Sequence, residues 1–217
     1  MEASNLILQK TIPQLLKWRH ETTGDKVALR EKEFGYWNSY TWNEYYERVR
    51  ITALGLEEIG VKKDDKVALI SDNIPEMLFV ALATQALGAI GVGIYQTTLP
   101  DEIAQLLEYM DVSFVFCDDQ EQVDKLVEIR ERIPQVVKVL YEDDRGMRSY
   151  RADDWFMFIE DLYRIGEEAF KNKADHFESL IQQGKPEDVC FFCLTSGTTG
   201  LSKGTMLTHR NYINMGV

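Results

Sequence analysis

The stretch KVALISDNIPEMLFVALATQALGAIGVGIYQ, residues 66–96, decides the fold class. Its two ends, residues 66–70 and 89–95, are short, apolar and rich in β-branched side chains, as buried strands are. Between them, residues 75–87 begin with a proline and carry apolar side chains at three-to-four spacing, which predicts a helix. A strand, a helix and a second strand form a right-handed crossover unit, so the stretch predicts a parallel sheet covered by helices.

The same alternation continues toward the C-terminus as far as residue 141. It predicts helices at 100–110 and 121–130, and strands at 112–117 and 136–141. The fold class is therefore α/β, with a largely parallel sheet, helices on both faces, and ligands expected beyond the carboxyl ends of the strands. Farther on, the pattern predicts an exposed polar connection, an amphipathic helix, a short helix and another buried strand, at residues 142–154, 155–170, 176–183 and 188–194.

Toward the N-terminus the signals are local. Residues 11–22 predict a helix that ends near Gly24, and residues 27–30 and 36–40 predict the two strands of a hairpin. The sequence Thr41-Trp42-Asn43-Glu44 fits a capping box, in which a Thr hydroxyl and a Glu carboxylate satisfy the first amides of a helix. That helix is expected to run to about Ile59.

The composition excludes several classes of protein. With 45% hydrophobic residues in 217, the chain can build a sizeable core, and a net charge of −12 argues against general nucleic-acid binding or docking on anionic lipid through a basic face. Residues 77–95 are nearly all apolar and could span a bilayer by length. However, three glycines and the absence of basic flanks favour a buried helix followed by a buried strand. No signal peptide is evident, so we expect a cytoplasmic protein without a transmembrane segment, either free or peripheral to a membrane.

The three cysteines do not form a disulfide framework. Cys190 and Cys193 make a C-x-x-C motif, but residues three apart on a strand point to opposite faces, and no second pair accompanies them. We interpret both, together with Cys117, as reduced core thiols.

The segment that carries chemistry follows the last predicted strand and reads TSGTTGLSKG, residues 195–204. Glycines allow the backbone to approach a ligand, hydroxyls donate to phosphoryl oxygens, and a lysine adds a positive charge. The order Ser-Lys-Gly excludes the common P-loop, which needs Gly-Lys-Ser/Thr. The interpretation as a plain Gly/Thr turn between two strands is the structural alternative. The candidate ATP phosphate-binding residues are Thr195, Ser196, Gly197, Thr198, Thr199, Gly200 and Lys203.

Residues 194–211 resemble the phosphate-loop signature of the adenylate-forming, AMP-binding superfamily, which includes acyl- and aryl-CoA synthetases. Ser202 departs from the signature, where proline is usual. Further similarity to the long-chain fatty acyl-CoA synthetase branch lies in residues 40–45, 73–76, 88–89 and 94–97.

The resemblance implies an ATP-dependent ligase that activates a fatty carboxylate as an acyl-adenylate and transfers it to coenzyme A, with Mg²⁺ sharing the phosphate charge. It implies that the loop from Thr195 to Lys203 holds the β- and γ-phosphates. It also places the Mg²⁺ ligand, the ribose aspartate and the catalytic lysine downstream of this sequence, so no catalytic residue is assigned here. We expect residues 1–217 to be the N-terminal part of the adenylation domain, truncated after the phosphate loop, without the C-terminal domain and inactive alone.

Other interpretations stay open. The chain could be a non-catalytic ligand-binding or interaction module on the same fold, whereas a P-loop kinase is disfavoured by the order of glycine and lysine. His209 could act as a base, but a structural role is favoured because Thr208 is placed to cap a helix there. His20 and His176 are interpreted as surface residues. The expected partners are small molecules only, and a homodimer is one arrangement that would cover exposed apolar surface.

Overall fold

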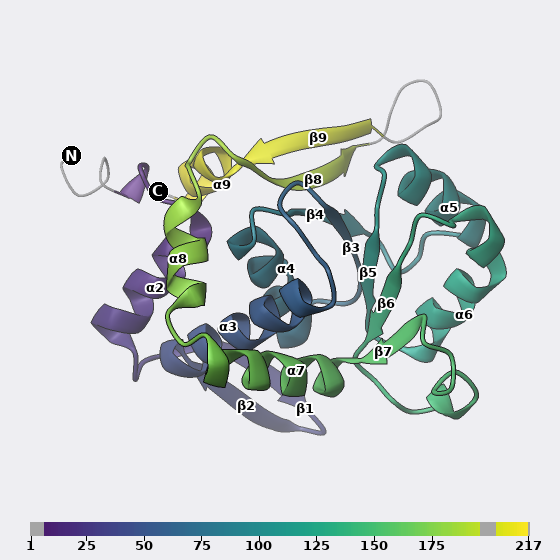
Figure 1. The fold of residues 1–217 in the computed structure, drawn as a ribbon, viewed down its shortest axis with the longest axis horizontal. Helices are drawn as coiled ribbons and strands as arrows, with labels where there is room; N and C mark the ends of the chain where they lie inside the picture. The colour runs from purple at the N-terminus through teal and green to yellow at the C-terminus, as the bar shows by residue number, and fades with distance from the viewer. Residues whose placement is uncertain (1–6, 196–202, 217) are drawn as a thin grey trace.

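The computed structural model describes residues 7–195 and 203–216. Its architecture is a seven-stranded sheet with helices on both faces, accompanied by a separate two-stranded hairpin (Figure 1). The strands of the large sheet are β3 (Lys66–Ile70), β4 (Ile90–Ile94), β5 (Phe114–Cys117), β6 (Lys138–Tyr141), β7 (Phe156–Phe158), β8 (Val189–Thr195) and β9 (Lys203–Thr208). The helices are α2 (Ile12–Thr23), α3 (Trp42–Glu58), α4 (Pro75–Ala86), α5 (Pro100–Tyr109), α6 (Gln120–Ile129), α7 (Ile159–Asn172), α8 (His176–Gln183) and α9 (His209–Gly216).

The strand order is β7-β6-β5-β3-β4-β8-β9, and every pair except β8–β9 is parallel. The α/β class and the largely parallel sheet predicted from the sequence are thereby confirmed. From β3 the chain crosses to β4 on one side, and from β5 it continues to β6 on the other side. The direction of the connections therefore reverses between β3 and β5. In open α/β sheets, ligands bind beside such a reversal, at the carboxyl ends of the strands.

Alternating residues of the strands pack into two separate hydrophobic cores, one on each face of the sheet. The first core lies under α3, α4 and α7, and the second lies under α5 and α6. Val67 and Leu69 of β3 face α3, α4 and α7, whereas Ala68 and Ile70 face α5 and α6. Both sets are fully or almost fully buried. This explains why the strands are continuous apolar runs rather than alternating ones, because a parallel sheet is covered on both faces.

Helices α3 and α7 approach each other unusually closely. A Cβ atom added at Gly166 of α7 would lie 1.8 Å from the carbonyl oxygen of Ile51 in α3, and one at Gly55 of α3 would lie 2.6 Å from the carbonyl oxygen of Leu162. The missing side chains of Gly55 and Gly166 let the two backbones meet over the first core.

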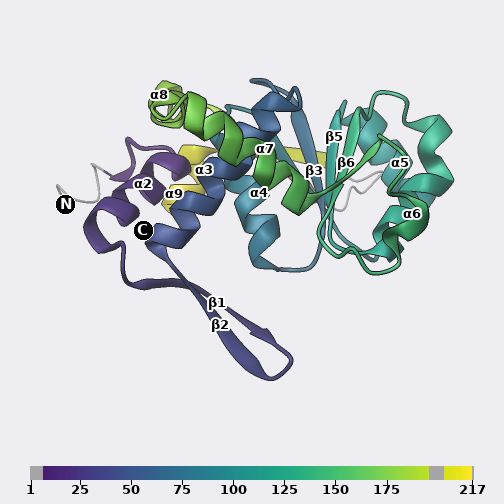
Figure 2. The same ribbon diagram turned by 60° about the horizontal axis from the view of Figure 1, so that its bottom comes forward.

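The N-terminal elements follow their capping signals. Thr11 and Thr41 each cap a helix in a complete capping box, with Gln14 and Glu44 as the returning side chains. Strands β1 (Val27–Glu33) and β2 (Tyr36–Thr41) form the predicted antiparallel hairpin. Figure 2 shows this hairpin projecting from the body of the molecule, with its turn at the far end.

Two expectations for residues 142–170 are wrong. Phe156–Phe158 form strand β7 rather than the first turn of a helix, because their backbone pairs with the open edge of β6 and helix α7 begins only at Ile159. The connection before β7 is not wholly exposed, since Met147 is completely buried in the second core.

The apolar residues 77–95 form most of helix α4 and strand β4, as expected. Among residues 7–195 and 203–216, no helix is both long and apolar enough to cross a membrane.

Candidate functional site

A crevice of about 360 Å³ opens at the carboxyl ends of β3, β4 and β8. Its polar lining comes from the turns that follow β3 and β4, and its apolar lining from the three strands and α4. Residues that line it include Ser71, Asp72, Met77, Gln96, Phe191 and Cys193. The crevice occupies the edge of the sheet at which an α/β fold is expected to bind its ligand.

Strands β8 and β9 frame the candidate phosphate loop. Thr195 ends β8, Lys203 begins β9, and the two residues are partners on the terminal rung of this antiparallel pair. The Thr195 hydroxyl donates a hydrogen bond of 3.2 Å to the Lys203 carbonyl oxygen. The structure therefore brings together two of the seven candidate residues, both exposed, at the carboxyl edge of the sheet.

The other five candidates, Ser196, Gly197, Thr198, Thr199 and Gly200, lie outside the described residues. Their role in phosphate binding stays a prediction. Among the described residues, no carboxylate lies within ion-pair distance of Lys203.

The Phe191 side chain of β8 packs over two glycines in β4. The ring of Phe191 lies over Gly91 and Gly93, where added Cβ atoms would stand 2.8 Å and 3.0 Å from ring carbons. A side chain at either position would displace the Phe191 ring. The glycines that interrupt the apolar stretch thus have a packing role beside the crevice.

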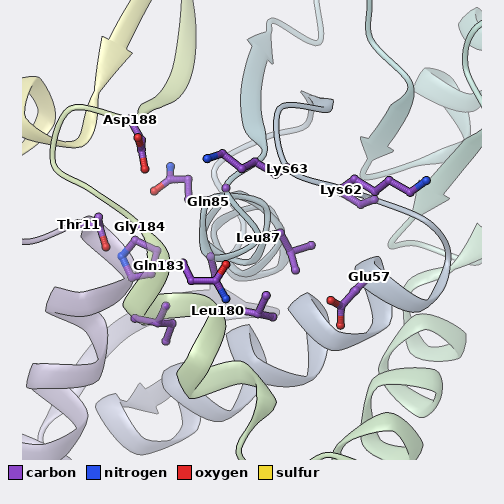
Figure 3. Close-up of a pocket in the computed structure, with 15 residues that line it drawn as sticks. Thr11, Glu57, Lys62, Lys63, Gln85, Leu87, Leu180, Gln183, Gly184 and Asp188 are labelled. Carbon is purple, nitrogen blue, oxygen red and sulfur yellow. The ribbon is translucent and has the colours of Figure 1, made fainter.

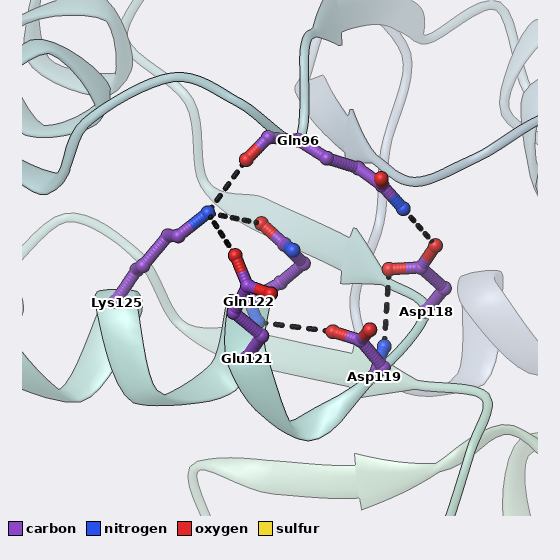
Figure 4. A network of polar contacts seen from close by, with 6 residues as sticks. All are labelled: Gln96, Asp118, Asp119, Glu121, Gln122 and Lys125. Carbon is purple, nitrogen blue, oxygen red and sulfur yellow. Dashed lines mark hydrogen bonds and ion pairs between the residues drawn. The ribbon is translucent and has the colours of Figure 1, made fainter.

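The buried carboxylate of Asp118 connects the turns after β3, β4 and β5. Figure 4 shows its contacts with Gln96 and Asp119. Asp118 accepts hydrogen bonds from the backbone amide of Asp72 at 2.8 Å, from the side-chain amide of Gln96, and from the amide of Asp119 at 3.0 Å. Lys125 of α6 donates to the Gln96 carbonyl oxygen at 2.6 Å. Burial raises the pKa of Asp118, although the Asp72 amide opposes that shift.

This Asp118 network, which comprises Asp118, Asp72, Gln96, Asp119 and Lys125, supports the rim of the crevice where the sheet connections diverge. Sequence reasoning did not single out Asp118. The only feature of the sequence that points to Asp118 is its position directly after a predicted strand of the parallel sheet.

Glu142 follows β6 at the same edge and is half-buried. Burial is the main cause that raises its pKa to about 7, and the carboxylates of Glu76 and Asp143 add to the shift. The folded-state pKa is above the ordinary value of 4.5, so the charged form of Glu142 destabilises the fold. That cost grows as the pH rises from about 4.5 to about 7 and is constant above this range.

Glu142→Gln is therefore expected to stabilise the protein at pH 8 by about 1–2 kcal/mol, after allowance for solvent screening of a half-buried group, and to change little at pH 4.5. Urea denaturation at the two pH values measures this, with the exposed Glu131→Gln as the control. An equal gain at both pH values would show that the ionisation of Glu142 is not the cause.

His209 is a structural residue. It is 3% exposed, and its Nδ1 accepts a hydrogen bond of 3.3 Å from the amide of Ile12. Burial lowers its pKa to about 4. Because β9 runs from Lys203 at the carboxyl edge to Thr208 at the opposite edge, His209 lies about 20 Å from the crevice end of that strand. The structural role favoured from the sequence agrees with this position, and Thr208 caps α9 through the amide of Asn211 at 3.2 Å.

The other two histidines, interpreted as surface residues, are partly exposed and contact side chains of α3. His20 stacks on Tyr46 at a centroid distance of 4.3 Å, and a ring nitrogen lies 2.7 Å from Asn43 Oδ1. His176 pairs with Glu57 at 2.8 Å. Both are half-buried and join helices, since each partner belongs to α3.

The cysteines are free thiols, but they are not all in the core. Cys117 and Cys190 are buried, and burial raises the pKa of Cys190 to about 12. Cys193 is exposed and lines the crevice. The opposite orientation of Cys190 and Cys193 agrees with the strand geometry, whereas the expectation that β8 is buried throughout is wrong, because only Cys190 in it is fully covered.

A second cavity, of about 420 Å³, lies at the opposite edge of the sheet (Figure 3). It is bounded by the starts of α2 and β8 and the ends of α3, α4 and α8. Several of its polar groups already serve the fold: Thr11 caps α2, Asp188 accepts the Lys185 amide at 2.8 Å, and Glu57 pairs with His176. It faces the amino ends of the parallel strands, so the crevice at the carboxyl ends is the candidate functional site.

Comparisons with known proteins show the family to which the chain belongs. The family model described as AMP-binding enzyme matches residues 16–217. The chain is 27% identical over 93% of its length to a long-chain-fatty-acid–CoA ligase, ACSBG2, of Xenopus laevis, and 29% identical over 93% to ACSBG1 of Bos taurus. It covers 26% and 27% of those two proteins, so the chain spans about a quarter of the length of the curated relatives it matches.

Solved structures share the fold. An anthranilate CoA ligase, AuaEII, in complex with anthranoyl-AMP superposes with a TM-score of 0.75 at 21% identity, over 98% of this chain and 37% of that one. The inhibitor-bound N-terminal domain of FACL13 from Mycobacterium tuberculosis gives a TM-score of 0.66 at 20% identity, over 92% of this chain and 44% of that one.

Proposed function

This chain belongs to the AMP-binding enzyme family, and from that membership we propose that it is the triphosphate-holding part of a long-chain fatty acyl-CoA ligase. The observation that carries the proposal is the terminal rung of the β8–β9 hairpin. It sets Lys203 and Thr195 side by side at the carboxyl edge of the sheet, at the two ends of a segment rich in glycine and hydroxyl residues.

The proposed reaction has two steps. A carboxylate oxygen attacks the α-phosphorus of ATP, the bond to the pyrophosphate oxygen breaks, and an acyl-adenylate remains. The thiol of coenzyme A, after losing its proton, then attacks the acyl carbon and displaces AMP. In the first step negative charge grows on the departing pyrophosphate, so fixed donors and a cation around it lower the barrier.

The part proposed for this chain is to hold that leaving group. The Lys203 ammonium supplies a compact positive charge, and the backbone and hydroxyl donors of residues 196–200 surround the β- and γ-phosphates. The Thr195 hydroxyl keeps the hairpin end closed through the Lys203 carbonyl oxygen. The Asp118 network connects the turns that line the crevice, and the Phe191 ring packs over Gly91 and Gly93 beside it.

The proposed acyl substrate is a long-chain fatty acid, and its support is the curated relatives, which are long-chain-fatty-acid–CoA ligases. Coenzyme A is the proposed acceptor for the same reason. Mg²⁺ is proposed as the counter-ion of the triphosphate. No three His, Cys, Asp or Glu side chains in residues 7–195 and 203–216 form a group that could hold a metal ion, so no protein ligand for Mg²⁺ is assigned.

Lys203→Ala tests the proposal directly. We expect it to weaken binding of ATP and of inorganic tripolyphosphate to the chain by about tenfold, because one charge-assisted contact to phosphate is lost. Binding of AMP, which lacks the β- and γ-phosphates, is expected to change little. Titration calorimetry with the three ligands measures the difference.

Lys62→Ala is the matched control, because Lys62 lines the cavity at the opposite edge of the sheet. It is expected to leave all three affinities unchanged. An equal loss of AMP and ATP affinity in Lys203→Ala, or the same loss in Lys62→Ala, would contradict a role of Lys203 on the terminal phosphates.

A further inference from the structure

We propose that the tip of the β1–β2 hairpin, residues Phe34, Tyr36 and Trp37, is a docking site for the surface of a zwitterionic lipid bilayer. The proposal is independent of the phosphate loop and of the proposed ligase activity. It is carried by exposure, backbone conformation, the arrangement of the side chains and the local charge.

The tip exposes three large aromatic side chains. Phe34 is 85% exposed, Tyr36 78% and Trp37 65%. The hairpin projects from the body with its turn at the far end (Figure 2). Phe34 lies in that turn, and Tyr36 and Trp37 are the first residues of β2. Three exposed aromatic residues gather within four positions at this tip, with Glu33 and Lys32 on the same two rungs. This differs from the scattered single apolar residues that any protein surface carries.

Phe34 occupies a position that disfavours it. It has φ of +45° and is followed by Gly35 at +88°, so both central residues of a two-residue turn have positive φ. Such turns prefer Asn-Gly, because a bulky side chain at positive φ is strained. Among the described residues, no contact compensates for that strain, because the Phe34 side chain is almost fully exposed. A strained apolar residue without contacts inside the fold points to contacts outside it.

The aromatic residues surround the tip rather than line one face. Glu33 pairs with Tyr36 and Lys32 with Trp37, so Tyr36 and Trp37 project from opposite faces of the ribbon. A protein partner that packs against a sheet covers one face, whereas end-on insertion covers both. Two rungs and the turn measure about 7–10 Å, which matches the depth to which interfacial segments enter a bilayer.

The charge of the hairpin and of the whole chain indicates which type of lipid bilayer the tip would bind. The hairpin carries Arg30, Glu31, Lys32 and Glu33, which sum to zero, while the whole chain has a net charge of −12. Anionic lipid would repel the chain, and the hairpin has no basic excess to offset that repulsion. Tyrosine and tryptophan are the residues that favour the interface between headgroups and acyl chains. The occupant that fits is a neutral, zwitterionic bilayer.

The test is binding of the whole chain, without nucleotide, to phosphatidylcholine vesicles in a flotation assay. Phe34→Asn is expected to lower the partition coefficient by about tenfold, as expected for the loss of one buried phenyl group. The same variant is expected to raise the midpoint of urea denaturation, since it creates the preferred Asn-Gly turn. A loss of binding in a more stable protein separates docking from folding.

Two further measurements complete the test. The vesicle-induced blue shift of tryptophan fluorescence is expected to disappear in Trp37→Phe. Tyr109→Ser removes a side chain that is 70% exposed on α5, far from the hairpin, and is expected to leave binding unchanged.

Three results would overturn the proposal. They are absence of binding by the unaltered chain, equal binding by Phe34→Asn, and binding only when the vesicles contain phosphatidylserine. A dimer that dissociates in Phe34→Asn without any effect on vesicle binding would assign the tip to a second copy of the chain instead.

Discussion

Gly166→Ala is expected to destabilise the fold by about 3 kcal/mol, because the new methyl group cannot be accommodated without separating two helices. Its Cβ would lie 1.8 Å from the carbonyl oxygen and 2.7 Å from the carbonyl carbon of Ile51. These are backbone atoms in the middle of α3, so no rotamer change relieves the overlap. Helix α7 must move outward, and the side chains of Leu162 and Ile159 would lose contacts in the first core.

Urea denaturation measures this loss as a lower midpoint at unchanged slope. Gly216→Ala is the matched control, because no heavy atom lies within 4 Å of a Cβ added at that helical glycine. It is expected to be neutral or slightly stabilising, since alanine is the better helix former. If Gly166→Ala were equally neutral, the close approach of α3 and α7 would not be a feature of the folded protein.

Asp118→Ala is expected to cost about 3 kcal/mol. The substitution removes the acceptor of three hydrogen bonds, from Asp72, Gln96 and Asp119, and leaves their donors without a partner at a buried site. The loss is confined to the carboxyl edge of the sheet. Hydrogen exchange of the Asp72 amide is therefore expected to accelerate more than that of amides in α2 or α3.

Asp119→Ala provides a comparison at the neighbouring position. Asp119 caps α6 by accepting one hydrogen bond, from the amide of Gln122 at 3.2 Å. Its loss is expected to cost about 1 kcal/mol, the usual effect of removing an N-cap. Equal effects of the two substitutions would indicate that Asp118 contributes no more than a local cap.

Most of the fold could be predicted from residues 11–141 because its signals are local. Capping boxes at Thr11 and Thr41, prolines that begin α4 and α5, and continuous apolar strands each depend on a few neighbouring residues. Strand β7 could not be predicted in this way. Residues Phe156–Phe158 are extended only because β6 offers a free edge, which is a property of the assembled sheet.

The residues of the candidate site also separate into those with a local sequence signal and those without one. Thr195 and Lys203 could be identified from residue type alone, since a segment rich in glycine and hydroxyl groups that ends in a lysine suits phosphate wherever it lies. The Asp118 network could not, because its members come from turns after three different strands. Cys193 was misassigned to the core because an apolar run does not reveal that one face of β8 is open.

The terminal rung of the β8–β9 hairpin has an entropic consequence for any ligand held there. Bringing the two ends of a chain segment together carries an entropic cost that grows with the logarithm of the segment's length. Here the hydrogen-bonded ladder of β8 and β9 already fixes Thr195 opposite Lys203 when the sheet forms. Binding of an anion therefore does not include the entropic cost of bringing these two residues together, and its affinity is higher by that amount.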